Sequence, residues 1–195
     1  MVENAVRKDL FKPLEKNTCR QRLGLPQNCR LIGTAGALAK NRGVEQLFGA
    51  FFRLKAAHSD LHLAVAGPRD VEIPEDPRIH DLGVLPLVQV PYFFNALDVA
   101  AICVKDNAFG RYCFPQKAVE IMACDVPLVA ARVGSLEGLF GNHPQWLFEP
   151  QSAAALAEAI ERRFQDSGTN YPAVPAWQDL AGRISDIMTA VRRCP

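Results

Sequence analysis

One stretch of the chain combines glycines with basic side chains in a way that suits an anion. Residues 33–43 read GTAGALAKNRG and follow a short apolar run. Glycine lets a backbone approach a ligand closely, and a helix that begins after such a loop presents unpaired N–H groups. Gly36, Lys40 and Arg42 therefore predict a phosphate or diphosphate site, although a solvated turn with two surface cations fits the loop equally well. The spacing matches neither G-x-G-x-x-G nor a Walker A loop.

A second stretch, residues 106–129, carries an acidic side chain in an apolar setting. Glu120 lies in a predicted short helix over 118–123 that Pro115 opens. A half-buried carboxylate needs hydrogen-bond donors. A pair of ligand hydroxyls, such as a ribose diol, would supply them, and so would Lys117 three residues earlier. The residues alone leave both interpretations open.

A third loop, residues 132–138, follows the apolar run that ends at Ala130. Its N–H groups and the hydroxyl of Ser135 are suited to meeting a sugar or a phosphate. An ordinary strand-to-helix turn is nevertheless the favoured interpretation of these residues.

Short apolar runs that alternate with helical patterns must position these loops. Strands are predicted at 31–34, 61–66, 99–104 and 126–130, with a weaker strand at 146–148 and a further short one at 79–82. Runs that are apolar at nearly every position are typical of central strands in a parallel sheet. Helices are predicted at about 43–57, at 91–97, at 118–123, around Leu156, Ile160 and Phe164 with Ser152 as N-cap, and from Trp177 to Val191.

This alternation predicts a single α/β domain built on a doubly wound, Rossmann-like parallel sheet with right-handed crossovers. In such sheets ligands bind at the carboxyl ends of the strands, near a topological switch point. The loops that follow residues 34, 66, 104 and 130 are therefore the ones expected to form a site.

Composition excludes several classes of protein. The chain has 195 residues, of which 49% are hydrophobic and 22% charged, and its formal net charge is +1. These values exclude a disordered chain and disfavour a nucleic-acid binder that works through bulk positive charge. An apolar run of roughly 18 residues, as a membrane span requires, is absent from the sequence, and the first residues do not resemble a secretory signal.

The cysteines and histidines show no spacing of a metal or disulfide framework. Six cysteines are scattered without a C-x-x-C pair, and the four histidines do not have metal-ligand spacing. Free thiols in a reducing compartment are favoured over disulfides, so the expected location is the cytoplasm. Neither a metal site nor a cofactor is expected.

The three loops, in this order, resemble the C-terminal, donor-binding half of the retaining GT-B glycosyltransferases of group 1 (family 4). Residues 36–44 are similar to the glycine loop of that family, and residues 63–67 to its second strand, which ends in glycine. Residues 82–99 are similar to its next tract. The most specific match is PQKAVEIMACDVPLVA, residues 115–130, against the family's P-x-K-x-x-E-x-M-A-x-G-x-P-V-V-A block. The resemblance runs over nearly the whole chain.

The resemblance implies a site for a UDP-, GDP- or ADP-linked sugar donor. It implies that Glu120 holds the ribose hydroxyls and that Arg42 contacts the diphosphate, whose growing negative charge it can stabilise on departure. The backbone at 109–110 would approach the donor, and the base would stack near residues 79–84. The expected substrate-binding residues are Gly36, Lys40, Arg42, Phe109, Gly110, Lys117, Glu120 and Ser135. The implied reaction is sugar transfer to an acceptor with retention of configuration, without a bound metal.

The chain departs from the family pattern at the first glutamate of the E-x7-E signature. Tyr112 stands eight residues before Glu120, where that glutamate belongs. A different alignment of the loop puts Asn107 there, with Asp106 beside it as a stand-in.

Two further positions also differ from the family. Ala37 replaces the arginine of the glycine loop, and Asp125 replaces a glycine. Together with the absent glutamate, these departures bear on contacts to the donor sugar more than on contacts to the diphosphate or ribose.

A GT-B enzyme has two Rossmann-like domains of roughly 150–200 residues each, and its active site lies between them. This chain matches one of the two domains. The expected organisation is an entry segment at 1–28, a core at 29–166 and a closing helix at 177–193. The N-terminal, acceptor-binding half is expected to be missing from this chain, which would then be inactive alone and expose an interdomain face open to self-association.

Two other functions stay open at this point. One is a non-catalytic nucleotide-sugar-binding or regulatory module, which the absent glutamate and Ala37 slightly favour. The other is half of a sugar-nucleotide epimerase, for which the acid and base carboxylates are not found. The sequence assigns no catalytic residue, and neither nucleic acid nor a membrane is an expected partner.

Overall fold

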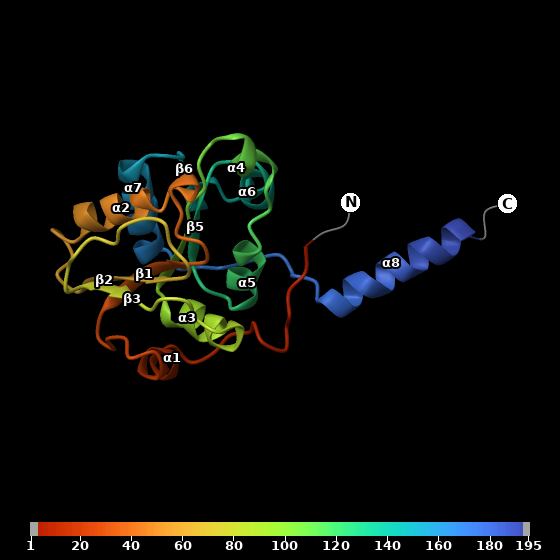
Figure 1. Cartoon of the computed structure of the whole chain (residues 1–195), viewed down its shortest axis with the longest axis horizontal. Coiled ribbons are helices and arrows are strands. Elements are labelled where there is room, and N and C mark those ends of the chain that lie inside the picture. Colours follow the sequence, from red (N-terminus) through yellow and green to blue (C-terminus); the bar gives the residue numbers. More distant parts are fainter. Residues whose placement is uncertain (1–3, 193–195) are drawn as a thin grey trace.

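Six parallel strands form one sheet at the centre of the molecule, shown in Figure 1. The computed structural model describes residues 4–192, with side chains described up to residue 189. The strands are β1 (Arg30–Ala35), β2 (Leu61–Ala66), β3 (Ile79–Asp81), β4 (Val99–Ile102), β5 (Leu128–Ala131) and β6 (Leu147–Phe148), in the order β3-β2-β1-β4-β5-β6. The predicted doubly wound, Rossmann-like α/β fold is confirmed.

The strands form where the sequence is apolar on both faces. Every residue of β4 and β5 is buried, and so are the five residues after Arg30 in β1. Such two-sided burial is what a parallel sheet covered by helices requires. The predicted strand at 146–148 begins one residue later, because Pro144–Trp146 forms a 3-10 turn, η3.

Helices cover both faces of the sheet. On one face α2 packs against α7, and on the other α1 packs against α3 (Figure 1). The helices are α1 (Lys16–Arg22), α2 (Glu45–Leu54), α3 (Val90–Ala96), α4 (Ala108–Tyr112), α5 (Lys117–Ala123), α6 (Ser135–Phe140), α7 (Ala153–Gln165) and α8 (Trp177–Arg192), with 3-10 turns η1 (Lys40–Arg42) and η2 (Leu87–Gln89). The predicted N-cap is confirmed, since the Ser152 hydroxyl accepts a hydrogen bond from the Ala155 N–H at 3.1 Å.

Three helical details differ from the sequence prediction. The helix expected at 43–57 is shorter, because η1 and a left-handed Gly43 precede it. Helix α1, inside the expected entry segment, is initiated by the Glu15 carboxylate, which accepts hydrogen bonds from two backbone N–H groups. Helix α4, inside a stretch expected to be a polar loop, is capped by the Asn107 side chain. Side-chain caps therefore create short helices that the apolar pattern does not reveal.

The entry segment is fixed to the core by buried polar side chains. Asn95 on α3 accepts a hydrogen bond from the Leu14 N–H at 2.8 Å and donates to the Lys12 carbonyl at 3.1 Å. Arg20 on α1 pairs with Asp98 at 2.7 Å and donates to the Ala96 carbonyl. Because each of these polar groups has a partner, their burial is tolerated.

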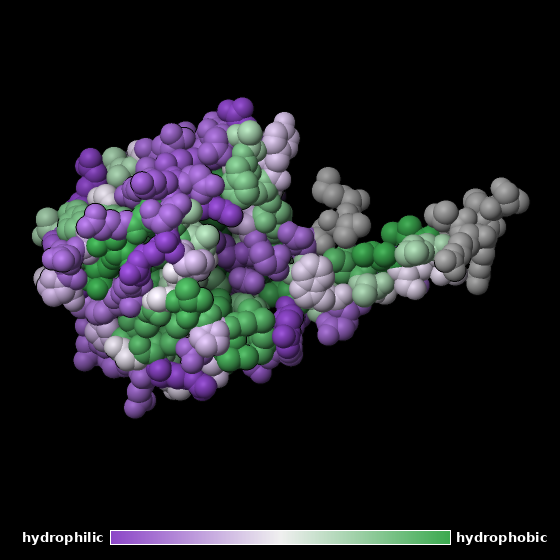
Figure 2. All heavy atoms as spheres, viewed as in Figure 1, coloured by the Kyte–Doolittle hydropathy of each residue, from purple (hydrophilic) through white to green (hydrophobic). Residues whose placement is uncertain are grey.

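Helix α8 extends away from the body of the domain (Figure 1). Leu180 is buried, whereas Ile184, Ile187 and Met188 are exposed, and Figure 2 shows apolar surface along the helix. None of the helices in residues 4–192 is both long and apolar enough to cross a membrane.

The cysteines in the described part of the chain are free thiols. They are Cys19, Cys29, Cys103, Cys113 and Cys124, while Cys194 and the last residue expected in the closing helix lie outside the described residues.

The backbones of three loops are joined at the carboxyl ends of β1, β2 and β3. The Gly36 N–H donates to the Ala66 carbonyl at 2.9 Å, and the Gly67 N–H donates to the Gly83 carbonyl at 2.7 Å. Gly67 has a φ of 139°, and a Cβ at this position would collide with the Gly36 carbonyl. Only glycine allows this approach.

Gly67→Ala should destabilise the fold more than Gly83→Ala. Both glycines have positive φ, but a Cβ at Gly83 would meet no atom within 4 Å. Backbone strain costs each variant about 1–2 kcal/mol, and steric overlap should cost Gly67→Ala about 1–3 kcal/mol more. Urea unfolding of the two variants measures this difference. Equal free energies of unfolding would show that the contact between Gly36 and Gly67 does not constrain the fold.

Candidate functional site

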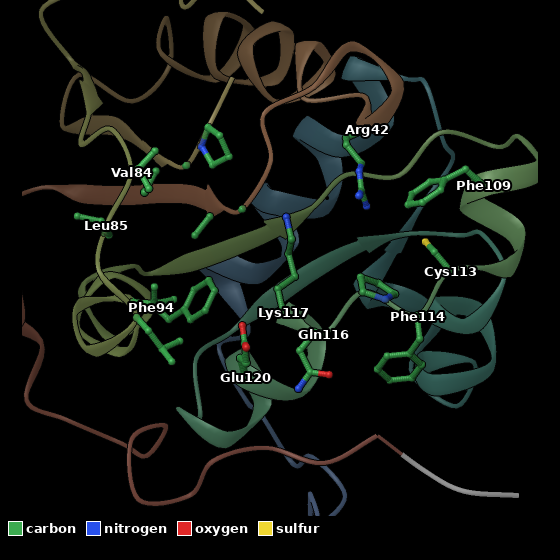
Figure 3. A pocket seen from close by; sticks show the side chains of 18 residues that line it. Arg42, Val84, Leu85, Phe94, Phe109, Cys113, Phe114, Gln116, Lys117 and Glu120 are labelled. Atoms are coloured by element: carbon green, nitrogen blue, oxygen red, sulfur yellow. The ribbon is translucent and has the colours of Figure 1, made fainter. Parts of the chain in front are cut away.

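A cleft of about 510 Å³ lies at the carboxyl ends of the central strands, as Figure 3 shows. It sits where the sheet order passes from β1 to β4, the topological switch point. Its lining comes from the ends of β1 and β2, from the loops after β1, β2 and β3, from α3, α4 and α5, and from the segment between α4 and α5. The lining residues are Ala35, Gly36, Arg42, Ala66, Gly67, Pro68, Val84, Leu85, Leu87, Val90, Phe94, Phe109, Cys113, Phe114, Pro115, Gln116, Lys117 and Glu120.

Helix α5 brings two charged side chains to this cleft. Ala118, Val119, Ile121 and Met122 are buried and fix the helix on the core. Lys117 and Glu120 are three residues apart, so they share the opposite, cleft-facing side of the helix.

Lys117 and Arg42 give the middle of the cleft a positive charge. The Lys117 Nζ donates to the Thr34 hydroxyl at 3.3 Å and lies over Gly36, where a Cβ would be 3.5 Å from it. Burial lowers the pKa of Lys117, and the charge of Arg42 lowers it further. The Arg42 guanidinium stacks over the Phe109 ring at 4.1 Å. An anion bound here would offset the unfavourable burial of the Lys117 ammonium.

Glu120, whose charge is opposite to that of Lys117 and Arg42, is also affected by burial. Burial raises the pKa of its carboxyl group, and the charge of Lys117 only partly opposes this rise. Among the described residues, the Lys117 ammonium makes no ion pair with Glu120 and is bonded to Thr34 instead. The carboxylate therefore faces the cleft with acceptor capacity to spare.

Five of the eight expected site residues meet in this cleft: Gly36, Arg42, Phe109, Lys117 and Glu120.

The other three, Lys40, Gly110 and Ser135, are not among its lining residues. Lys40 lies in η1, where its N–H donates to the Asp70 carboxylate at 2.8 Å. Gly110 is buried against the Lys105 carbonyl. The Ser135 hydroxyl donates to the Cys113 carbonyl at 2.8 Å.

The residues considered for the position of the family's first glutamate, Tyr112, Asn107 and Asp106, do not line the cleft. Tyr112 is 89% exposed and points to solvent. The Asn107 side chain caps α4 by accepting from the Gly110 N–H at 2.9 Å. Asp106 is paired with Arg111 at 2.6 Å. Among the described residues that line the cleft, Glu120 is thus the one carboxylate.

Apart from Phe109 and Val84, which lies in the tract expected to meet a base, the apolar lining of the cleft was not predicted from the sequence. Val84, Leu85, Leu87, Val90 and Phe94 form one side, next to the tract expected to meet a base. They come from a loop, a 3-10 turn and a helix, so no spacing connects them. With apolar ends and a charged middle, the cleft suits an elongated ligand that carries negative charge at its centre.

The chain resembles known proteins over most of its length. A family model for glycosyl transferases group 1 matches residues 29–166. TuaC of Bacillus subtilis, a glycosyltransferase named for teichuronic acid biosynthesis, is 31% identical over 147 residues, which are 75% of this chain and 36% of TuaC. The chain spans about 36–50% of the length of the curated relatives that it matches.

Many solved structures share the fold. The C-terminal domain of the group 1 glycosyltransferase LpcC from Francisella tularensis has a TM-score of 0.67 and 21% identity, covering 83% of this chain and 89% of that one. HepE from Anabaena, solved with UDP, has a TM-score of 0.78 and 19% identity, covering 97% of this chain and 57% of that one.

The carboxyl group of Glu120 predicts a stability cost that depends on pH. Its pKa in the folded chain is raised above the usual 4.5. The folded chain therefore has its full stability below pH 4.5 and loses part of its free energy of unfolding as the pH rises through the raised pKa. Glu120→Gln removes this loss. Urea unfolding should show the variant more stable than wild type near neutral pH, and the two should converge in acid. Glu158→Gln, at an exposed position on α7, controls for the removed charge. A destabilised Glu120→Gln at neutral pH would contradict this account.

Proposed function

Because the chain belongs to the group 1 glycosyltransferase family, we propose that its cleft binds a nucleoside-diphosphate sugar. In this proposal the chain is the donor half of an enzyme that transfers the sugar to an acceptor with retention of configuration. The observation that carries the proposal is the meeting of Lys117, Arg42 and Glu120 in one cleft at the switch point of the sheet.

The diphosphate occupies the middle of the cleft, beside Lys117 and Arg42. These cations come from two elements, α5 and η1, and both face the cleft (Figure 3). Burial lowers the pKa of Lys117, and a bound anion would raise it again and hold the ammonium charged. Charge-assisted hydrogen bonds to phosphate are among the strong ones in proteins.

Glu120 accepts hydrogen bonds from the ribose hydroxyls. The carboxylate is partly desolvated and is not neutralised by Lys117 among the described residues. Two hydroxyl donors would offset its desolvation. The base then lies against Val84, Leu85 and Leu87, whose apolar surface suits a flat aromatic ring.

Reaction breaks the bond between the anomeric carbon of the sugar and the diphosphate oxygen. The leaving diphosphate gains negative charge, and two preorganised cations stabilise that charge without further rearrangement. The acceptor hydroxyl attacks the same face from which the diphosphate leaves and passes its proton to the departing diphosphate oxygen, which gives retention.

A second domain would complete the active site and bind the acceptor. The matched relatives are about twice as long as the region of similarity or longer. The exposed apolar residues of α8 suit contact with such a domain or, in its absence, with a second copy of this chain.

One observation favours a second function: with Glu120 as the one carboxylate among the described lining residues, the cleft also fits a non-catalytic nucleotide-sugar-binding module.

Arg42→Ala and Lys117→Ala should each weaken nucleoside-diphosphate binding about tenfold to a hundredfold. Hydrogen bonds to charged groups contribute about 1.5–3 kcal/mol. Isothermal titration with UDP, GDP and ADP measures the change. The affinity should also fall with added salt, because salt screens the cations.

Arg53→Ala provides the matched control, since Arg53 is exposed on α2 and is not among the lining residues. Binding by Arg53→Ala should equal that of wild type. If Arg42→Ala and Lys117→Ala bind as wild type does, the diphosphate site is elsewhere.

A further inference from the structure

Lys117 stands in the cleft without an anionic partner among the described side chains. Its Nζ donates a hydrogen bond to a neutral group, the Thr34 hydroxyl, at 3.3 Å. It takes part in none of the ion pairs within residues 4–189. A lysine that is desolvated in this way, with its pKa lowered by burial, has a larger share of the neutral amine than an exposed lysine.

The titratable groups around Lys117 do little to restore its charge. Burial raises the pKa of the Cys103 thiol, one residue after β4, to about 12, so this thiol carries no charge near neutral pH. The charge of Arg42 in η1 lowers the pKa of Lys117 further. Glu120 in α5 opposes this with a smaller effect, and burial raises the pKa of its own carboxyl group. The ammonium form of Lys117 is therefore poorly compensated in the cleft.

The Lys117 amine is open to a ligand. The side chain is half-buried, and in Figure 3 it points into the cleft between Val84 on one side and Arg42 on the other. Beside it lies Gly36, where an added Cβ would be 3.5 Å from Nζ, so bare backbone borders the amine there. The volume of about 510 Å³ is within the range of pockets that bind small molecules. A neutral amine with this access is a nucleophile.

Arg42, the other cation of the cleft, has a different chemistry. A guanidinium stays protonated in proteins, so it is no nucleophile, and its N–H groups bind phosphate well. The face of the Arg42 guanidinium lies over the Phe109 ring at 4.1 Å. This stacking leaves the N–H groups, which lie in the guanidinium plane, for an anion. The cleft thus places an anchor for phosphate beside an amine that can form a covalent bond.

We propose that Lys117 is a reversible modification site for small phosphorylated aldehydes, with the phosphate group bound by Arg42 and the aldehyde carbon bonded to Nζ. The Nζ lone pair forms the C–N bond, and the π electrons of the carbonyl move to its oxygen. That oxygen gains a proton and the nitrogen loses one, which gives a carbinolamine.

Loss of water from the carbinolamine completes the modification. Its hydroxyl takes a proton from solvent and leaves as water, while the nitrogen lone pair forms the C=N bond. The nitrogen then returns a proton to solvent. Amine and aldehyde thus become imine and water, and neither an oxidant nor a reductant is needed.

This inference goes beyond the proposed function and does not require it, because the reacting species is the cleft without a nucleotide. A nucleoside diphosphate bound at Arg42 and Lys117 would hold the lysine as its ammonium form. Donor binding and imine formation should therefore exclude each other, and the modification would be a reversible block of the donor site.

Reductive trapping with pyridoxal phosphate and sodium borohydride tests the site on the whole chain. Borohydride converts an imine into a stable secondary amine, which mass spectrometry maps to a residue, and Nα-acetyllysine in the same solution is the reference amine. The ratio of trapping at Lys117 to trapping of the reference should be about tenfold to a hundredfold higher with pyridoxal phosphate than with pyridoxal, which lacks the phosphate. Hydrogen bonds to charged groups contribute a factor of this size.

Two pairs of variants identify the groups involved. Arg42→Ala should make the two ratios equal, whereas Arg53→Ala, at an exposed position on α2 outside the lining, should keep their difference. Lys117→Arg keeps the positive charge but removes the amine, so it should abolish the imine absorbance of the cleft. Lys8→Arg, at an exposed position outside the lining, should retain it. Mapping in the wild-type chain decides the site even where a variant fails to fold.

The outcomes separate this inference from the proposed function. If UDP, GDP or ADP binds but pyridoxal phosphate is trapped at Lys117 no faster than at the reference amine, the inference is wrong and the proposed function stands. Equal ratios for pyridoxal phosphate and pyridoxal in the wild-type chain also overturn the inference. If Lys117 is trapped preferentially and none of the three nucleotides slows the trapping, the inference stands and the proposed function fails.

Discussion

The backbones of Gly36 and Gly67 touch at the carboxyl ends of β1 and β2, and the cleft depends on this contact. It brings the loops of two neighbouring strands so close that a Cβ at residue 67 has no room. Gly83 joins from the third loop through the Gly67 N–H. The same approach leaves space above Gly36 for the Lys117 ammonium. The floor of the cleft is thus bare backbone, over which a charged ligand can lie near the protein.

Burying the Lys117 and Glu120 side chains as ions lowers the stability of the folded chain. Burial lowers the pKa of Lys117 and raises the pKa of Glu120, so both side chains are less favourable as ions in the folded chain than in water. Lys117 has only a hydroxyl partner in the described residues, at Thr34. Groups of this kind are common at functional sites because the ligand supplies the missing partners. A diphosphate and a ribose diol would satisfy both side chains in the account proposed here.

The sheet and its strands could be predicted because burial on both faces leaves continuous apolar runs such as 61–66. The glycine loop and Glu120 could also be found, since glycines, cations and an isolated carboxylate stand out in the sequence. Most of the apolar lining could not be predicted. Residues such as Phe94 and Phe114 are separated along the chain, and only the strand order brings them together.

Asp125 stands where the family pattern has a glycine, and its backbone is left-handed, with a φ of 55°. Aspartate tolerates this conformation better than most residues.

A heteronuclear NMR titration with unlabelled UDP and GDP tests the central claim most directly, because backbone amides report where a ligand lies. The largest shifts should fall on the amides of Gly36, Gly67 and Lys117 and on the Arg42 loop, with saturation for at least one nucleotide. A hollow of about 640 Å³ between residues 8–13 and 169–174 provides an internal comparison. Shifts concentrated there, with the amides around Gly36 and Lys117 unchanged, would contradict a donor site at the switch point of the sheet.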